Sequence, residues 1–260
     1  MQSIGPTVQR FLAPRYQLYF QQNQLDDFDA LWSLDLDPVD APNLERGGHS
    51  EVSRVTLDAQ GLPSRTFFVK RQTNHLGRSL QRPLGEPTFA REARNVATFH
   101  RLNIPALETA YFEERKNAGR WQAILITPEL EGYADMIDIH SGWPDTPEPT
   151  RARIIDSCGE LLRTLHKRRW RHGSLYAKHV FLRADDAALH GFDARFIDLE
   201  KSRPLLVAGK EKRRDLQIFA RRLTQWQAEE WRRLLSIYLE QPMESRQVGR
   251  WMRALKLSEA

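Results

Sequence analysis

The middle of the chain carries a polar run, His172-Gly173-Ser174-Leu175-Tyr176-Ala177-Lys178-His179, followed directly by the apolar run Val180-Phe181-Leu182. A second apolar run ends on a carboxylate and reads Phe196-Ile197-Asp198-Leu199-Glu200. These segments predict two short strands, Val180–Leu182 and Arg195–Ile197, joined by a polar turn. Such a hairpin brings the polar run and Asp198 close together.

Two side chains of this hairpin are candidate metal ligands. Asp198 directly follows a strand, where a carboxylate is held rigidly while it stays accessible, and carboxylate oxygens are ligands that Mg²⁺ prefers. His179 ends the polar run beside the neighbouring strand. Taken singly, His179 is typical of a polar residue with satisfied hydrogen bonds, and Asp198 is typical of a turn. Their positions across one hairpin favour a shared metal site.

An ion pair is expected between Lys70 and Glu92 in the first half of the chain. Lys70 closes a three-residue apolar run, and Glu92 lies on the apolar face of a helix predicted from about Pro87 to Leu102. A carboxylate on a buried face needs a cation, because desolvating an unpaired ion costs several kcal/mol. Pairing of Glu92 with Arg91 or Arg94 at the surface is the alternative that the sequence leaves open.

The first half of the chain reads as extended segments around that one helix. Strands are predicted at Glu51–Leu57, Arg65–Lys70 and Ala123–Thr127, with a turn at Asp58–Pro63 between the first two. A proline-rich passage, Pro144 to Pro149, then leads into the second half. The first half therefore predicts a small sheet that carries one helix.

The second half is predicted to be mainly helical. Thr150 is the expected N-cap of a long helix after the proline-rich passage. The buried stripe of this helix is Ile154, Cys158, Leu161 and Leu165. Later helices, from about Lys210, carry two further stripes, Leu216, Phe219, Ala220 and Leu223, then Trp231, Leu234, Leu235 and Tyr238. Together with the sheet of the first half, this pattern predicts an α+β fold.

Composition limits the partners and the compartment. The chain has 260 residues, 40% of them hydrophobic, which is enough for a substantial core. Its formal net charge of +5 suits polyanionic partners, but no recognisable nucleic-acid-binding module accompanies it, so we expect no nucleic acid. No run approaches the roughly 18 apolar residues of a membrane span, and Cys158 is a single cysteine. We expect a cytoplasmic protein.

The order of these motifs resembles the lipopolysaccharide core kinase family of the InaA/WaaP type, and its InaA branch in particular. The resemblance is carried by Arg46-Gly47-Gly48-His49-Ser50, by residues 85–92, by residues 173–182 and by Ile197-Asp198-Leu199-Glu200-Lys201. It implies a two-lobed, protein-kinase-like fold with a small antiparallel sheet lobe plus one helix, and a mainly helical C-terminal lobe. The expected limits are an N-terminal extension at 1–45, a nucleotide-binding lobe at 46–130 and a helical lobe at 131–260.

The resemblance also implies ATP and Mg²⁺ as cofactors and assigns residues to them. The residues implied in ATP binding are Gly47, Gly48, Ser50, Lys70, Glu92, Glu129 and Leu130. Gly47 and Gly48 would let the backbone approach the ATP phosphates, to which Ser50 would hydrogen-bond. Lys70 would contact the phosphates, and Glu92 would hold Lys70 in place. Glu129 and Leu130 would belong to a hinge that faces adenine.

In the second lobe the resemblance implies a catalytic loop and a metal site. The implied catalytic residues are His172, Ser174, Lys178 and Asp198, and the implied Mg²⁺ ligands are His179 and Asp198. His179 stands where most kinases have asparagine. Asp215 resembles the acid that braces this loop, whereas its position alone predicts a charge at the start of a helix.

Ser174 stands where the kinase loop has the aspartate that accepts the proton of the acceptor hydroxyl. General-base assistance contributes roughly 10²–10⁴-fold, whereas most of phosphoryl transfer rests on positioning and on cations. The chain is therefore expected to be a phosphotransferase acting on a sugar hydroxyl, by resemblance in the lipopolysaccharide inner core. A non-catalytic, kinase-like protein (a pseudokinase) and a kinase for a small soluble metabolite or antibiotic are the alternatives.

The resemblance further implies where such a protein works. The acceptor would be the lipopolysaccharide core or another sugar-containing molecule. Basic helices in the second half suit an anionic glycolipid or membrane surface. We therefore expect peripheral contact with the inner face of the inner membrane.

Overall fold

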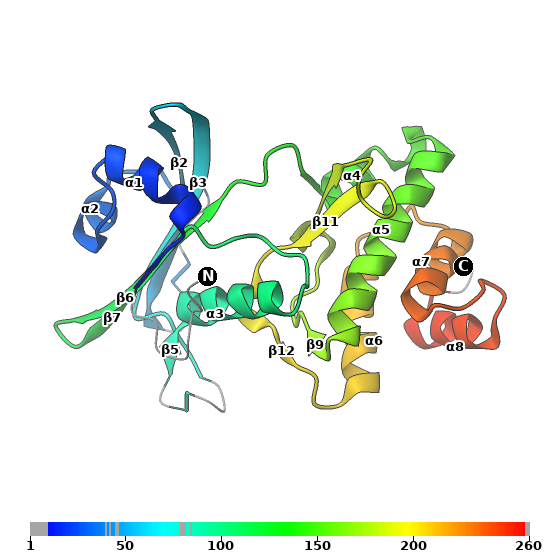
Figure 1. Ribbon diagram of the computed structural model, residues 1–260. Coiled ribbons are helices and arrows are strands. Elements are labelled where there is room, and N and C mark those ends of the chain that lie inside the picture. The colour runs from blue at the N-terminus through cyan, green and yellow to red at the C-terminus, as the bar shows by residue number, and fades with distance from the viewer. Residues whose placement is uncertain are drawn as a thin grey trace. The chain divides into compact units, whose positions relative to one another are not determined.

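The structure is a computed structural model that describes residues 10–39, 41, 43–44, 47–78, 82–83 and 85–257. Arg46, part of one motif above, lies outside the described residues. The chain divides into two compact units (Figure 1). Unit 1 comprises Met1–Thr98 and Leu107–Glu129, and unit 2 comprises Phe99–Ala106 and Leu130–Ala260. Residues 99–106, inside the first lobe expected from the sequence, thus cluster with unit 2.

Unit 1 is built on a five-stranded antiparallel sheet with the strand order β1-β6-β7-β3-β2. The strands are β1 (Arg10–Leu12), β2 (His49–Ala59), β3 (Leu62–Thr73), β6 (Tyr111–Asn117) and β7 (Arg120–Pro128). Ala118 and Gly119 both have positive φ, as a tight hairpin between β6 and β7 requires. The three predicted strands lie within β2, β3 and β7, whereas β1 and β6 were not predicted.

One face of this sheet packs against helix α3 (Thr88–Arg101). Lys70 lies opposite Val52 on β2 and Leu125 on β7, so these side chains share that face. A buried cluster fills the contact and comprises Phe89, Ala90, Ala93, Phe112, Ala123 and Leu125. The helix starts one residue later than expected, because Pro87 belongs to the short strand β5 (Glu86–Pro87), which pairs with β4 (Leu76–Gly77).

The other face is covered by the N-terminal segment, which the sequence did not predict to be helical. It forms a 3-10 turn (Pro14–Tyr16), α1 (Gln17–Gln22) and α2 (Phe28–Ser33). The rings of Tyr16, Tyr19 and Phe20 lie 5.2–5.9 Å from the ring of Phe67, which is fully buried. The sheet of unit 1 therefore packs against helical segments on both faces.

Unit 2 is mainly helical. Its helices are α4 (Met136–Ser141), α5 (Glu148–Lys167), α6 (Ala208–Ala220), α7 (Ala228–Leu239) and α8 (Arg246–Leu255). The predicted hairpin is present as β10 (Val180–Ala184) and β11 (Phe192–Phe196), with β8 (Ala134–Asp135) on the other side of β10. A second small sheet pairs β9 (Trp170–Arg171) with β12 (Arg203–Pro204). The α+β class expected from the sequence is confirmed.

Two details of the helical predictions were wrong. Thr150 does not cap α5, because the N-cap is Pro147, three residues earlier. The first turn of the helix contains a proline, whose fixed φ suits that position. Leu223 lies beyond the end of α6, although it is buried. The predicted buried stripe of α5 is confirmed.

Gly159 sets how closely α5 and α7 pack. A Cβ atom at this position would lie 2.9 Å from Cβ of Ile237 and 3.0 Å from the carbonyl oxygen of Leu234. The close approach therefore requires glycine. It helps to place the C-terminal end of α5 beside α7, where both helices contribute to the site described next.

Candidate active site

Unit 1 contains a buried ion pair. Nζ of Lys70 on β3 lies 2.7 Å from Oε1 of Glu92 on α3, and the side chains are 18% and 3% exposed. Arg91 and Arg94 pair instead with Glu86. The predicted Lys70–Glu92 pair is confirmed, and the surface alternative is wrong.

A glycine turn leads into β2. Before this turn, Pro38 and Asn43 form isolated β-bridges with Ser53 and Ser50 of β2. Gly47 has φ of +70°, and a Cβ at Gly48 would lie 2.4 Å from backbone atoms of Asn74 and His75. The close approach of Gly48 is thus to its own chain. The two glycines help to line a cavity of about 250 Å³, together with His49, Thr73, Asn74 and Arg120.

Ser50 lies on the lysine side of the sheet. It pairs with Gln72, two residues after Lys70, and side chains two apart in a strand point to the same face. Oε1 of Gln72 in turn accepts the backbone N–H of Phe89 at 2.9 Å, which fixes the start of α3 against the sheet. Ser50, Lys70 and Glu92 therefore belong to one face of unit 1.

The two hinge candidates fall on either side of the division between the units. Glu129 ends unit 1, and Leu130 begins the second stretch of unit 2. The backbone N–H of Glu129 donates to the carbonyl of Thr66 at 2.9 Å, and its carboxylate accepts from Arg54 at 2.8 and 3.0 Å. The carbonyl of Leu130 accepts the N–H of Tyr133. An adenine-facing role for Glu129 and Leu130 stays a prediction.

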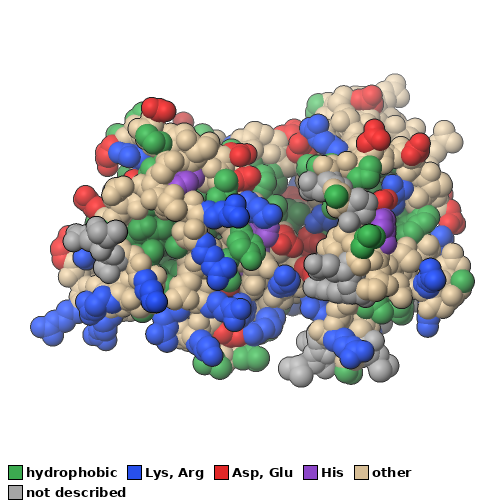
Figure 2. Space-filling model, turned by 180° about the vertical axis from the view of Figure 1, so that it is seen from behind, with side chains coloured by type: hydrophobic (Ala, Val, Ile, Leu, Met, Phe, Trp, Pro, Cys, Tyr) green, Lys and Arg blue, Asp and Glu red, His purple; other side chains and the backbone are tan. Residues whose placement is uncertain are grey.

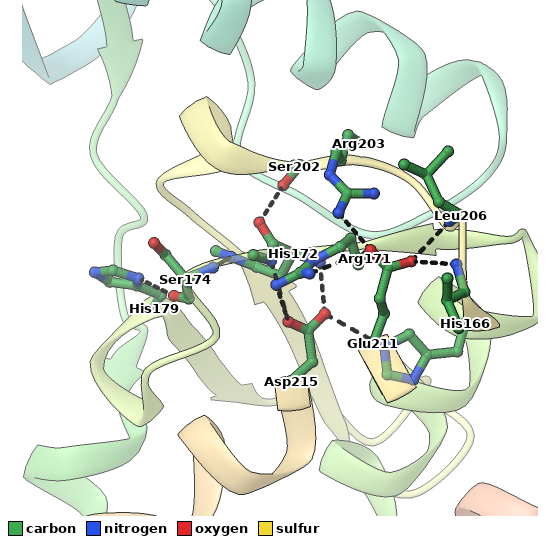
Figure 3. Close-up of polar contacts among 12 residues, drawn as sticks. His166, Arg171, His172, Ser174, His179, Ser202, Arg203, Leu206, Glu211 and Asp215 are labelled. Carbon is green, nitrogen blue, oxygen red and sulfur yellow. Dashed lines mark hydrogen bonds and ion pairs between the residues drawn. The ribbon is translucent and has the colours of Figure 1, made fainter. Parts of the chain in front are cut away.

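In unit 2 a fully buried aspartate holds the start of the polar loop (Figure 3). Asp215 accepts the backbone N–H of His172 at 2.8 Å through Oδ2 and that of Gly173 at 3.2 Å through Oδ1. Burial alone would raise the pKa of Asp215, but hydrogen bonds from His166 and His172 hold it below the usual value. Asp215 lies in the middle of α6, so the expectation of a helix-start charge was wrong.

His166 and Tyr238 extend this buried network to α5 and α7. Nε2 of His166 lies 3.4 Å from Oδ2 of Asp215, and Nδ1 lies 2.8 Å from the hydroxyl of Tyr238. Because an ionised carboxylate only accepts, Nε2 carries the proton and Nδ1 accepts from Tyr238. Burial lowers the pKa of His166 and so favours this neutral ring. Sequence reasoning missed both residues, although each occupies a buried helix position, where a polar group needs a partner.

His172 is also fully buried. Its Nε2 donates to the carbonyl of Ile197 at 2.9 Å, and its Nδ1 accepts the N–H of Ser174 at 3.4 Å. Burial lowers the pKa of His172 to about 4. Both ring nitrogens therefore contact the backbone, and the neutral ring joins the loop to the residue that precedes Asp198.

The hairpin brings His179 and Asp198 together, as predicted. Nδ1 of His179 donates to the carbonyl of Ser174 at 2.8 Å and lies 3.4 Å from Oδ2 of Asp198. The Asp198 side chain is 41% exposed, and its backbone is left-handed, with φ of 57°. Ser174 is 5% exposed, whereas Lys178 is exposed in the short 3-10 turn Ala177–His179.

As a magnesium site, Asp198 and His179 would supply only part of the ligands. Among the described residues, no group of three or more His, Cys, Asp or Glu side chains could hold a metal by itself. Mg²⁺ usually takes one or two carboxylates, several waters and substrate phosphates. Asp198 would supply the carboxylate. With Nδ1 of His179 donating to Ser174, the lone pair of the neutral ring is on Nε2.

The sheet unit with its lysine–glutamate pair and the helical unit with its braced loop define the class of two-lobed, protein-kinase-like proteins. The chain belongs to the lipopolysaccharide kinase (Kdo/WaaP) family, whose sequence model matches residues 29–238. Over 215 residues it is 27% identical to Protein InaA of Escherichia coli (strain K12), covering 82% of this chain and 95% of that protein. The family resemblance expected from the motifs is thus confirmed.

A solved structure supports the fold. The structure of WaaP in complex with acyl carrier protein matches with a TM-score of 0.64 at 18% sequence identity. The match covers 97% of this chain and all of that one. In the part of the chain that the structure describes, no helix is long and apolar enough to cross a membrane.

Proposed function

We propose that the protein is an ATP- and Mg²⁺-dependent phosphotransferase that acts on a sugar hydroxyl, in the inner core of lipopolysaccharide. Membership of the lipopolysaccharide kinase family supports a sugar kinase. The observation that carries the proposal is the 2.7 Å ion pair between Lys70 and the buried carboxylate of Glu92. A strand lysine fixed by a helix glutamate is the arrangement that positions nucleotide phosphates in kinases.

In this proposal unit 1 binds the nucleotide. Lys70 contacts the phosphates, and Glu92 holds its ammonium in place. The backbone of the turn at Gly47 and Gly48 lies close to the phosphates, and Ser50 hydrogen-bonds to them. Glu129 and Leu130 supply the contact with adenine.

Unit 2 supplies the metal ligands and the loop that receives the acceptor. Asp198 and His179 hold Mg²⁺, which neutralises phosphate charge when it is bound. His172 keeps the loop in shape, and Lys178 offsets the charge of the group being transferred. The loop backbone is fixed beforehand by Asp215, so little reorganisation is needed when the acceptor arrives.

A pseudokinase is the second candidate, and Ser174 is the observation that favours it. A serine cannot accept the acceptor proton as the usual aspartate does, and Ser174 is almost completely buried. Loss of a general base costs roughly 10²–10⁴-fold, which leaves the contributions of positioning and charge. We therefore expect slow transfer rather than none.

We also propose that the protein works in the cytoplasm with peripheral contact to the inner face of the inner membrane. Its sugar acceptor would be part of a glycolipid, and its net charge of +5 suits an anionic surface. The experiment that tests the proposed activity is acceptor-dependent release of ADP by the wild type and by Asp198→Ala. Equal rates in the two proteins would remove the kinase and leave the pseudokinase.

A further inference from the structure

Two neighbouring apolar side chains of unit 2 stand in solvent. Leu206 and Val207, here called the apolar tip, lie between β12 and α6 and are 70% and 62% exposed. Leu205 beside them is buried. Single exposed apolar residues are common, but adjacent ones at a loop apex need an explanation.

The apolar tip is held firmly rather than left loose. The carboxylate of Glu211 accepts the backbone N–H of Leu206 at 2.7 Å and that of Val207 at 3.0 Å. Glu211 is itself fixed by Arg203 and Arg171. Figure 3 shows the amide of Leu206 turned toward Glu211 while its side chain extends away from that carboxylate. The loop therefore presents its apolar side chains outward from a fixed backbone.

Four exposed cations lie near the apolar tip, either close in sequence or through a backbone contact, and we call them the basic rim. The basic rim comprises Arg169, Lys210, Arg213 and Arg214. The N–H of Leu205 donates to the carbonyl of Arg169 at 2.8 Å. Nε of Arg213 reaches back to the carbonyl of Gly209, two residues beyond the apolar tip.

The charge of the basic rim is not neutralised within the protein. All four side chains are exposed, and none forms an ion pair with another residue of the described part of the chain. The one acid between positions 201 and 214 is Glu211, which is committed to Arg203 and Arg171. Figure 2 shows many Lys and Arg side chains over the face in view, several of them along its lower left edge.

We propose that the apolar tip inserts into the headgroup region of an anionic lipid bilayer while the basic rim contacts lipid phosphates. Apolar side chains flanked by Lys and Arg are the combination that binds such surfaces. Two side chains offer far less than the roughly 800 Å² per partner of a standard protein interface, so a membrane fits better than an acidic protein. The inference rests on the proposed function only in that a glycolipid acceptor would lie in the same membrane.

Site-specific labelling tests the insertion directly. The single natural cysteine, Cys158, is fully buried, and burial raises the pKa of its thiol to about 12, so a cysteine introduced at the apolar tip is labelled selectively. Leu206→Cys with an environment-sensitive dye should show a severalfold rise in fluorescence with phosphatidylethanolamine vesicles that contain phosphatidylglycerol. Leu189→Cys is the matched control, because Leu189 is 79% exposed but stands on the turn that carries Asp185 and Asp186.

Co-sedimentation with the same vesicles measures the contribution of each part. Leu206→Ser/Val207→Ser should weaken binding by about tenfold or more, because burial of both side chains is lost, and Leu189→Ser should bind like the wild type. Arg213→Gln/Arg214→Gln should weaken binding and reduce its dependence on salt. A thermal melt of each variant checks that the fold is retained.

The proposal is overturned if wild-type protein binds anionic vesicles no better than phosphatidylcholine vesicles, or if the double serine variant binds as well as the wild type. Equal dye responses at positions 206 and 189 would overturn it too. Asp198→Ala should bind vesicles like the wild type. Vesicle binding can therefore fail while ADP release succeeds, and the reverse, so the two proposals are tested separately.

Discussion

The buried carboxylate of Asp215 accepts the backbone N–H of His172 at 2.8 Å. This hydrogen bond joins the middle of α6 to the first residue of the polar loop. Gly173 donates to the same carboxylate, and a Cβ on Gly173, whose φ is +82°, would lie 2.5 Å from the carbonyl of Lys201. The loop that carries Ser174 is thus fixed by a helix acid and by a close approach that excludes other residues.

Replacing this acid tests how strongly the loop depends on it. Asp215→Asn keeps the size of the side chain but removes its charge and one acceptor oxygen, which leaves a buried donor unpaired. We expect the free energy of unfolding to fall by about 1–3 kcal/mol, measured by urea denaturation. Asp186→Asn, at an exposed surface pair with Arg153, should change stability by less than about 1 kcal/mol. Similar losses in the two variants would contradict the bracing role.

The Lys70–Glu92 pair should behave as one unit. Lys70→Met removes the cation that pairs with the buried carboxylate of Glu92. The free energy of unfolding should therefore fall by about 3–5 kcal/mol. Lys70→Met/Glu92→Gln should recover part of this loss, since no buried charge remains. Urea denaturation of both single variants and the double variant gives the coupling energy, for which we expect about 1–3 kcal/mol. Additive losses would mean that the two side chains act independently.

Gly159 should not tolerate even one added methyl group. Gly159→Ala places a Cβ 2.9 Å from Cβ of Ile237 and should cost about 1–3 kcal/mol through overpacking. Gly249→Ala is a matched helical control, because its Cβ would meet only the Arg253 guanidinium at 3.7 Å. Helix propensity alone should then stabilise the control by up to about 1 kcal/mol. Thermal denaturation of both variants measures these changes in stability. Equal changes in the two variants would argue against close packing of α5 on α7.

Stability should fall in acid partly through Glu211. Burial alone would raise the pKa of Glu211, but hydrogen bonds from Arg203 and from the amides of Leu206 and Val207 lower it from 4.5 to about 2. The unfolded chain therefore takes up this proton first, and the stabilisation, complete above pH 4.5, is lost as the pH falls toward 2. Glu211→Gln should make the loss of stability over this window shallower, measured by urea denaturation at each pH. An unchanged slope would contradict the assignment.

The sequence predicted those parts of the site whose signal is local. Lys70 after an apolar run, Glu92 on an apolar helix face and Asp198 after a strand each have an environment that neighbouring residues define. The structure brings the first two together, although Lys70 lies within β3 rather than at its end. It also brings Asp198 beside His179. Their roles in binding nucleotide and metal stay predictions.

The parts that sequence reasoning missed depend on distant partners. Helices α1 and α2 have six residues each, too few for a clear helical period, and they are stabilised by packing on the sheet. The start of α6 at Ala208 depends on the carboxylate of Glu211 reaching back to two loop amides. Asp215 therefore lies in the middle of α6 rather than at its start, and its carboxylate contacts the loop.

The most direct test of the proposed activity is ADP release with ATP, Mg²⁺ and a lipopolysaccharide core acceptor. The wild type should release ADP slowly and only with the acceptor, and both Asp198→Ala and Lys70→Ala should fall to the background rate. Ser174→Asp should raise the single-turnover rate, since it restores a general base worth roughly 10²–10⁴-fold. The same acceptor-independent rate in the wild type and in Asp198→Ala would contradict phosphoryl transfer by this protein.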